Sequence, residues 1–569
     1  MSPTLLERAV DRLQDEPVNA DLARPDQGLT VGQCLLAQLT DWGVERIYGV
    51  IGDANLFFLD DIAKQSKIQY VPFLDENAAA LAASAEAKLT GRVAVVLGTS
   101  GPGLANMLNG LGDAYADGAG VLAITGQVDA AQVGTHAKQY IQQQLTAAPF
   151  AAFSECLAHP DALPELLQRC LALSAARGCV THLSIPKAMY REKVRGAALP
   201  YGAHLHQPLL APTEDVEAVF RMIAEARRPM LVLGRGVEAV PGETRAFVEA
   251  VGAAVTATLP ARHVFPHDHP QFVGGFGLAG SEAASVLLAE SDLVVVCGAT
   301  WWPDEYAPPN ARIVQIDAVR DNIGVGFPVA RGLVGDLRDI MPRFAGMAAS
   351  LARDEDAAAA WRRRITDVRL DWERRLAAEA AREGAPLAPQ RLMKLLSEAI
   401  PSSAVVALDT GDHTLWWGRS FANHGQRVLV SGRWRTLGFA LPAAIAAALA
   451  APERPVVAVA GDGGVVQTLL ELKTAAKLGL PIALVVVNNG AYAIELNRMR
   501  SAGLSPLGAT LDNPDFAAIA EACGCVGVRA ADEASFRAAL EAAFAPDRER
   551  RPMLIDVAVA PEVMPHTKI

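Results

Sequence analysis

Apolar runs of strand length alternate with helical patterns along most of the chain. Near its start, segments 92–97 and 120–125 are almost continuously apolar, and 78–89 shows the spacing of a helix. Strands that are apolar on both faces and flanked by helices are typical of a parallel sheet that helices cover on both sides. The pattern therefore predicts an α/β fold in this part of the chain.

The same alternation appears twice more, which predicts an α/β protein of three doubly wound, parallel-sheet domains. The predicted domains are residues 29–195, 214–345 and 386–560, here called blocks one, two and three. Residues 196–213, rich in Pro, Gly and His, are interpreted as a linker, and 345–383 as a solvated helical connector rather than a core element. Further strands are predicted at 229–234, 293–297 and 312–317, and at 404–408, 455–460 and 481–487.

The composition is that of a globular, acidic protein. Of 569 residues, 51% are hydrophobic and 20% charged, and the net charge is −12, which excludes a disordered chain and argues against nucleic acid as the main partner. Cys523 and Cys525 have the spacing of neither a redox pair nor a zinc site, so the seven cysteines are predicted to be reduced thiols of a cytoplasmic protein. The N-terminus lacks the apolar core of a signal peptide. The longest apolar stretch, 439–452, is shorter than a membrane span of about 20 residues, so no span is expected.

The most informative motif is Gly-Asp-Gly-Gly at 461–464, followed later by Asn488 and Asn489. The motif leaves an apolar strand and opens a helix, and the 27 residues from Asp462 to Asn489 (489 − 462 = 27) leave room for one helix and the next parallel strand. Both residues would then lie at the carboxyl edge of adjacent strands. Their oxygens suit Mg²⁺, and the glycines let backbone N–H groups approach phosphate oxygens. The motif alone could be an ordinary tight turn, but the strand and the asparagines favour a site for Mg²⁺ and diphosphate.

With these residues the sequence resembles a known superfamily, because GDGG followed by NN at this distance is the signature of the thiamine diphosphate enzymes. The three-block order resembles the pyruvate oxidase and acetolactate synthase family, closest in pattern to pyruvate oxidase or the quinone-linked pyruvate dehydrogenase. The resemblance implies that block one binds the aminopyrimidine of thiamine diphosphate and block three its diphosphate. It covers the chain from about Gly32 to Val559 and rests further on segments 49–53, 98–103, 315–317, 335–336 and 513–524.

Carried over by position, the resemblance implies a metal site and a cofactor site. Mg²⁺ would be held by Asp462, Asn489 and the backbone carbonyl of Ala491, which also lies against the cofactor. Leu437 would be the bulky residue that bends the cofactor, although an ordinary core leucine is the alternative. The other implied cofactor-binding residues are Gly52, Thr99, Ser100 and Gly101 in block one, and Asp409, Gly411, Gly461, Gly463, Gly464 and Tyr492 in block three.

Glu76 is the implied catalytic acid. It follows a predicted strand and begins a helix, where it would protonate the pyrimidine ring and so help to generate the carbon nucleophile of the cofactor. An acidic residue in a first helical turn also has a purely electrostatic explanation. In the family this glutamate meets the metal site across a subunit interface, so a homodimer or homotetramer with active sites at the interface is implied.

Segment 134–139 matches the part of the family that faces the reacting carbon. Gln139 is retained, whereas Lys138 stands where oxidases and acetolactate synthases carry an aromatic residue. Lys138 either binds an anionic substrate group or points into solvent. His136 is a single histidine that is either structural or catalytic, so all three residues are candidates for the catalytic set.

Other departures change the charge near the site. Leu74 and Asp75 replace the arginine and histidine that precede the glutamate in many relatives. Arg433 and Arg435 make the segment before Leu437 unusually cationic, and they either clamp a carboxylate or phosphate or form an interface salt bridge.

Block two is where FAD binds in the oxidase and acetolactate synthase branches. A glycine-rich turn can donate backbone hydrogen bonds to a pyrophosphate, and an acid after a strand can accept ribose hydroxyls. Trp301 and Trp302 either flank a flavin or fill the core. Members without flavin keep similar turns, so FAD stays an open alternative. The implied FAD contacts are Gly234, Gly236, Asp317 and Asp336, with further resemblance in loops 274–280 and 298–303.

The predicted function is that of a thiamine diphosphate- and Mg²⁺-dependent enzyme acting on a 2-oxo acid such as pyruvate. Decarboxylation would give an enamine that is oxidised through FAD. The alternative is a carboligase or lyase of the acetolactate synthase type with structural FAD or none, and reduction of a bound flavin by pyruvate separates the two. A third possibility, a catalytically silent binding protein, is disfavoured by the presence of Glu76, Asp462 and Asn489.

Overall fold

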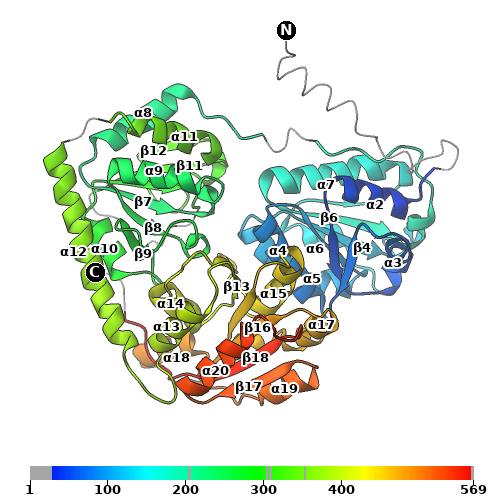
Figure 1. The fold of residues 1–569 in the computed structure, drawn as a ribbon. Coiled ribbons are helices and arrows are strands. Elements are labelled where there is room, and N and C mark those ends of the chain that lie inside the picture. Colours follow the sequence, from blue (N-terminus) through cyan, green and yellow to red (C-terminus); the bar gives the residue numbers. More distant parts are fainter. Residues whose placement is uncertain are drawn as a thin grey trace, which may run out of the picture.

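The computed structural model describes residues 28–202, 207–300, 302, 306, 311–351 and 354–565. It contains three six-stranded sheets, one in each block, and the strands of each sheet are paired in parallel. Figure 1 shows blocks one (blue to cyan) and two (green) as two lobes, joined by block three (yellow to red). The predicted fold class is therefore confirmed.

Block one carries its sheet in the order β2-β1-β3-β4-β6-β5. Helix α4 begins where Asp75 accepts a hydrogen bond from the Ala78 N–H, and it ends at Gly91 in the left-handed region (φ 69°). The elements are β1 Arg46–Gly49, β2 Gln69–Pro72, β3 Ala94–Gly98, β4 Val121–Gln127, β5 Ala151–Cys156, β6 Val180–Pro186, α2 Val31–Asp41, α3 Leu56–Ala63, α4 Glu76–Thr90, α5 Pro102–Ala116, α6 Gln143–Ala147 and α7 Leu163–Arg177.

Block two carries its sheet in the order β12-β11-β10-β7-β8-β9. The predicted strands 293–297 and 312–317 coincide with β10 and β11. β10 is apolar throughout and buried on both faces, and β11 is buried from Ile313 to Asp317. The elements are β7 Pro229–Leu233, β8 Ala254–Ala257, β9 Phe272–Gly275, β10 Leu293–Cys297, β11 Arg312–Asp317, β12 Arg331–Val334, α8 Thr213–Glu225, α9 Pro241–Val251, α10 Glu282–Glu290 and α11 Leu337–Ala348.

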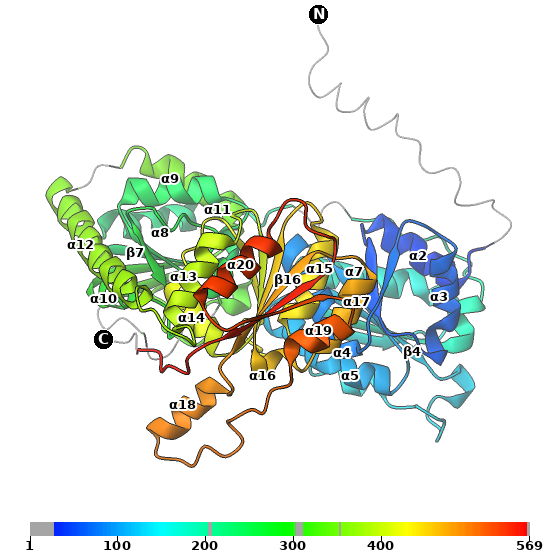
Figure 2. The same ribbon diagram turned by 60° about the horizontal axis from the view of Figure 1, so that its bottom comes forward.

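Block three repeats the same order as block one, β14-β13-β15-β16-β18-β17. Figure 2 shows that α18 and the loop after it project from the body of this block. The elements are β13 Val405–Leu408, β14 Arg427–Val430, β15 Val456–Gly461, β16 Ile482–Asn488, β17 Val526–Ala530, β18 Met553–Ala558, α13 Pro389–Ala399, α14 Asp412–Ser420, α15 Ala440–Ala450, α16 Asp462–Val465, α17 Leu472–Lys477, α18 Ala493–Ser501, α19 Phe516–Ala522 and α20 Glu533–Ala543.

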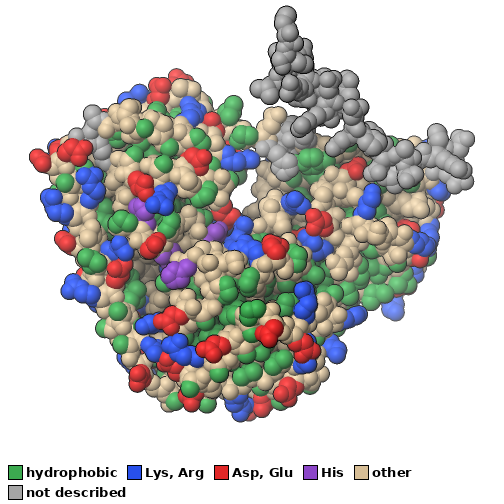
Figure 3. Space-filling model, in the orientation of Figure 1, with side chains coloured by type: hydrophobic (Ala, Val, Ile, Leu, Met, Phe, Trp, Pro, Cys, Tyr) green, Lys and Arg blue, Asp and Glu red, His purple; other side chains and the backbone are tan. Residues whose placement is uncertain are grey.

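Blocks one and three share one hydrophobic core. The alanine-rich helices α4 and α15 both belong to it, together with strands of both sheets. Small side chains let helix backbones approach closely, and the Lys88 ammonium at the end of α4 lies 4.8 Å from the ring centroid of Phe439 at the start of α15. The two halves of the predicted site are thus held in one packed body. In the orientation of Figure 1, the surface of the molecule is hollowed between the lobes of blocks one and two, and Lys and Arg side chains lie at the rim of the hollow (Figure 3).

The connector between blocks two and three forms helix α12, Glu355–Ala380. The prediction of a helix is confirmed, but the prediction that it is solvated rather than part of a core was wrong. Trp361, Ile365 and Trp372 are buried in the core of block two, and the Trp361 Nε1–H donates to the carbonyl of Pro229 at 3.1 Å. These apolar residues share one helix face, a pattern that the surrounding charged residues obscured.

The seven cysteines are free thiols, and five of them are buried, as predicted. Along the described residues, none of the helices combines the length and the apolar character needed to cross a membrane.

Candidate active site

The GDGG turn and the two asparagines lie next to each other at one edge of the block-three sheet. Strands β15 and β16 pair in parallel up to Gly461 opposite Val487, so Asp462 and Asn488 follow at the same carboxyl edge. The Asp462 Oδ2 accepts a hydrogen bond of 2.7 Å from the Gly490 N–H, which follows Asn489 directly. The structure therefore brings together the residues that the spacing predicted to meet.

The Asp462 carboxylate is buried and has no cationic partner. Its oxygens accept hydrogen bonds from the backbone N–H groups of Gly463 (3.0 Å) and Gly490 (2.7 Å), and 2% of the residue is exposed. Burial raises the pKa of this carboxyl, because the charged form is separated from water. No Lys, Arg or His within 4 Å compensates its charge along the described residues. A bound divalent cation would supply that counter-charge, so the donor set fits Mg²⁺.

The other proposed metal ligands lie on the same short segment. The Asn489 Oδ1 accepts from the Ala491 N–H at 3.2 Å, and Ala491 bridges Thr510 at the base of the α18 projection. Next along the chain, the ring of Tyr492 lies so close to Gly463 that any Cβ there would collide with it. Glycine at 463 is thus needed for this close approach.

Asn513 completes the cluster, and the sequence did not single it out. Its Nδ2 donates to the Asp462 Oδ2 at 2.7 Å and to the Asn488 Oδ1 at 3.0 Å, and Asn488 in turn donates to Asp556. Asn513 therefore orients the Asp462 carboxylate through a direct hydrogen bond. In the sequence, Asn513 could be noticed only as the first residue of segment 513–524, which resembles the family.

We expect Asn513→Ala to weaken Mg²⁺ binding in the presence of thiamine diphosphate by about 10- to 100-fold, as for other groups that orient a metal ligand. Titration of the protein with MgCl₂, followed by the thermal unfolding midpoint, measures the change. Asn497→Ala is the matched control, because among the residues that the structure describes the Asn497 side chain donates one hydrogen bond, to the Glu562 carbonyl at 3.4 Å. Equal Mg²⁺ affinity in the Asn513 variant and the wild type would contradict the orienting role.

Asp409 holds the turn that contains Leu437. Its Oδ1 accepts from the N–H groups of Thr410 (2.7 Å) and Gly438 (3.0 Å), and Gly464 packs against the same carboxyl. Burial raises the pKa of Asp409 to about 7. Because its oxygens are engaged within the protein, Asp409 shapes the turn, and Leu437 is left half-buried beside it.

His413 is a second residue that the sequence did not single out. Its ring lies against Gly411 and Gly461, the two glycines predicted near the diphosphate, and its Nε2 finds no hydrogen-bond partner along the described residues. Burial lowers the pKa of His413 to about 4, so the ring is neutral at physiological pH. In the sequence, His413 could have been found from its position two residues after Gly411, at the start of α14.

The block-one residues form a separate cluster around Glu76. The Glu76 Oε2 accepts from the Asn106 Nδ2 at 3.0 Å, and the side chain is 8% exposed. Gly103 approaches both Glu76 and Thr99, and Gly52 lies against Thr99. Asn106 had not been identified from the sequence.

The 128–142 loop joins this cluster through its backbone. The Gln139 carbonyl lies against Gly101, and Gln139 itself has a positive φ of 65°, while the neighbouring Ser100 is buried. His136 and Lys138 are exposed on the same loop, and neither makes a side-chain hydrogen bond or ion pair along the described residues. The loop thus approaches the cluster, and both alternatives for Lys138 stay open.

The block-one and block-three clusters do not merge within one chain. Along the described residues no hydrogen bond joins Glu76 to Asp462 or Asn489. Near these clusters, block one contacts block three through the Leu74 N–H, which donates a hydrogen bond to the Glu471 Oε1 at 3.0 Å. Burial raises the pKa of Glu471 to about 7.

The block-two residues implied for FAD make hydrogen bonds within the protein. The N–H groups of Gly234 and Gly236 donate to the carbonyls of Cys297 (2.9 Å) and Gly298 (3.2 Å), so neither is available to a pyrophosphate. Asp336 caps helix α11 and pairs with Arg338.

The other two block-two candidates are also engaged in the fold. Asp317 accepts from the Val319 N–H and from Asn322. Trp302 is buried between Phe276 and Phe327, which places it in the core of block two, and Trp301 lies outside the described residues.

Arg433 and Arg435 are exposed, and neither side chain forms an ion pair along the described residues. The backbone N–H of Arg433 donates to the Asp117 Oδ1 at 2.8 Å, and Arg435 has a positive φ of 58°. Both guanidinium groups are thus open to an anionic ligand or to a second chain.

Comparisons with known proteins agree with this arrangement of blocks. Three family models match: the N-terminal thiamine pyrophosphate binding domain at residues 29–148, the central domain at 216–344 and the C-terminal thiamine pyrophosphate binding domain at 409–557. The chain is 32% identical over 540 residues to YdaP of Bacillus subtilis, a protein named for thiamine pyrophosphate without a reaction (94% of this chain, 92% of that protein).

Two further relatives are named for reactions. An acetolactate synthase large subunit of Corynebacterium glutamicum is 30% identical over 564 residues (94% of this chain, 88% of that protein). A sulfoacetaldehyde acetyltransferase of Castellaniella defragrans is 29% identical over 544 residues (88% of each chain).

Proposed function

The chain belongs to the thiamine pyrophosphate enzymes of the pyruvate oxidase and acetolactate synthase family, and from this membership we propose that it is a carboligase. It would use thiamine diphosphate and Mg²⁺ to decarboxylate a small 2-oxo acid such as pyruvate and join the remaining two-carbon unit to a second carbonyl compound. The observation that carries the cofactor assignment is the buried Asp462 carboxylate beside Asn489 and Asn513, which has no cationic partner in the part of the chain that the structure describes.

The block-three cluster has the groups to hold a metal diphosphate. Asp462, Asn489 and the Ala491 carbonyl would bind Mg²⁺, and its remaining coordination sites would be left to phosphate oxygens and water. His413, with a neutral ring and an unpartnered Nε2, is positioned beside Gly461 to meet a phosphate oxygen. When bound, thiamine diphosphate supplies a carbon nucleophile that adds to carbonyls and stabilises negative charge after loss of CO₂.

Glu76 would hold the proton that activates the pyrimidine ring. Asn106 occupies its Oε2, which leaves Oε1 as the oxygen available to carry a proton, next to Gly103. The buried position keeps water from competing for that oxygen, since the residue is 8% exposed.

We propose that the active site forms between two chains of a homodimer or homotetramer. Large apolar side chains are exposed next to both clusters: Ile51 and Leu74 near Glu76, and Val466 and Leu470 after the GDGG turn. Exposed apolar side chains beside polar sites are typical of a surface that a partner covers. A second copy would bury these residues and bring its Glu76 to the metal cluster.

FAD-linked oxidation is the second candidate, supported by the α/β fold of block two and by Asp317 at the end of β11. The engaged amides of Gly234 and Gly236 favour the carboligase instead. Two relatives are named for acetolactate synthesis and for acetyl transfer, which supports transfer of a two-carbon unit here as well.

We expect purified protein supplied with thiamine diphosphate, MgCl₂ and pyruvate to release CO₂ and form acetolactate. The visible spectrum before and after anaerobic addition of pyruvate is recorded in the same sample. Bleaching of a bound flavin without a ligation product would favour the oxidase. Absence of thiamine diphosphate binding would reject both candidates.

A further inference from the structure

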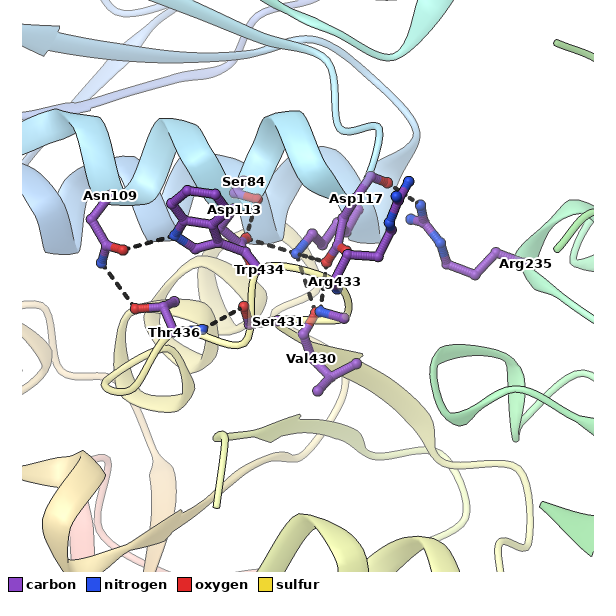
Figure 4. A network of polar contacts seen from close by, with 12 residues as sticks. Ser84, Asn109, Asp113, Asp117, Arg235, Val430, Ser431, Arg433, Trp434 and Thr436 are labelled. Carbon is purple, nitrogen blue, oxygen red and sulfur yellow. Dashed lines mark hydrogen bonds and ion pairs between the residues drawn. The ribbon is translucent and has the colours of Figure 1, made fainter. Parts of the chain in front are cut away.

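One helix of block one contacts both Glu76 and the segment before Leu437 through a row of polar side chains. Asn106, Asn109 and Asp113 on α5 and Asp117 directly after it are spaced by three, four and four residues, so they share one helix face. Asn106 binds Glu76, Asn109 and Asp117 bind block three, and Asp113 binds Ser84 and Lys88 of block one. Figure 4 shows Asn109, Asp113 and Asp117 directed towards the segment before Leu437.

Residues 431–436, here called the docking segment, lie along this face of α5. The Gly432 and Arg433 N–H groups donate to the Asp117 carboxylate at 2.7 and 2.8 Å. The Trp434 ring packs on Gly112, where a Cβ would approach it to 2.6 Å, and its Nε1–H donates to the Asn109 Oδ1 at 2.8 Å. The Trp434 ring can approach the helix this closely because residue 112 is a glycine.

A buried ionic cluster fixes the far end of the docking segment. The Lys88 Nζ lies 2.7 Å from Asp113 and 2.6 Å from Asp117, and it also donates to the Val430 carbonyl at 3.2 Å. The side chains of Lys88 and Asp113 are 4% and 0% exposed. Breaking such a pair leaves a buried charge uncompensated, so this end is a rigid anchor.

Asn109 occupies the opposite end, nearest to the two clusters. Its Nδ2 donates to the Asn77 Oδ1 at 3.0 Å and to the Thr436 Oγ1 at 2.9 Å, and its Oδ1 accepts from Trp434. Asn77 directly follows Glu76, and Thr436 directly precedes Leu437. The two amide hydrogens and the carbonyl oxygen of one side chain are therefore all used.

We infer that Asn109 is a positioning residue that links the placement of Glu76 to that of Leu437. Neither a leucine nor an aspartate could replace it, because one lacks all three bonds and the other lacks both donors. The inference rests on the proposed function, in which Glu76 sets turnover and Leu437 supports the bound cofactor. If two chains share each site, Glu76 and Leu437 of one chain serve different sites, and Asn109 couples them.

The test compares three single variants and one double variant by two constants, the apparent Kd for thiamine diphosphate and kcat at saturating cofactor. We expect Asn109→Ala to change both by about tenfold, the effect of losing one to two hydrogen bonds. Thr436→Val should raise mainly the Kd, and Asn77→Ala should lower mainly kcat. The rise in Kd of the double variant Asn109→Ala/Thr436→Val should be smaller than the product of the two single effects, because both changes remove the bond between Asn109 and Thr436, while only Thr436→Val also removes the bond that Thr436 donates to the Leu437 carbonyl.

Trp434→Phe and Trp361→Phe form a matched pair of controls. Each removes one indole hydrogen bond, to Asn109 and to the Pro229 carbonyl respectively, but Trp361 is on helix α12 and packs into the core of block two, away from the docking segment. We expect the Kd for thiamine diphosphate to rise several-fold in Trp434→Phe only, since one hydrogen bond corresponds to about that factor. Equal effects of the two changes would attribute the result to general destabilisation and overturn the inference.

Unchanged Kd and kcat in Asn109→Ala, beside an active wild type, would reject the inference and leave the proposed function intact. Wild-type protein that binds no thiamine diphosphate would reject the proposed function and the inference with it.

Discussion

Glu76→Gln is expected to lower kcat by a factor on the order of 10²–10⁴, the range for loss of a general acid–base group. Glutamine has nearly the size of glutamate, and its amide oxygen can still accept the hydrogen bond that Asn106 donates to Glu76 at 3.0 Å. It cannot carry the exchangeable proton of a carboxyl group. The variant should therefore fold and bind thiamine diphosphate like the wild type, and only turnover should fall.

The measurement is steady-state release of CO₂ from pyruvate at saturating cofactor, together with the thermal unfolding midpoint. Glu192→Gln is a matched control in the same block, because Glu192 is exposed and lies away from the Glu76 cluster. Full activity of Glu76→Gln would refute the assignment of this carboxylate. A large fall in the unfolding midpoint would instead give Glu76 a structural role.

Asp462→Asn is expected to weaken the binding of Mg²⁺ and thiamine diphosphate by a factor on the order of 10², because the metal loses its only carboxylate ligand. In the protein without cofactor, Asp462 is a buried carboxylate whose pKa is raised by burial, so removing its charge relieves a desolvation cost. The variant should therefore fold without cofactor, and its defect should appear only when cofactor is added.

Ligand-dependent stabilisation measures this defect directly. At a cofactor concentration of 100 Kd the wild type should gain about 2.7 kcal/mol, whereas a hundredfold weaker variant should gain only about 0.4 kcal/mol at the same concentration. Addition of EDTA to the wild type should lower its stabilisation by the cofactor to that of the variant. Equal stabilisation of the two proteins would show that Asp462 does not bind the metal.

Much of the fold could be predicted from local patterns. The predicted strands 293–297 and 312–317 became β10 and β11 with the predicted bounds, because strands buried on both faces of a sheet are rich in apolar, β-branched residues. The meeting of Asp462 with the asparagine pair also followed from spacing, because the carboxyl ends of adjacent parallel strands share one edge. Helix α12 shows where this reasoning failed, since a few apolar residues on one face outweighed a charged composition.

The sequence by itself determined the three α/β blocks, the family and the turn where Asp462 and Asn489 meet, because strand periodicity and short-range spacing record these features. The tertiary structure alone decided which partners complete the site. Asn513 reaches Asp462 across 51 residues, and Asn109 reaches Thr436 across 327. No local pattern records such contacts, since a hydrogen bond between distant segments depends on how whole helices and sheets pack against one another.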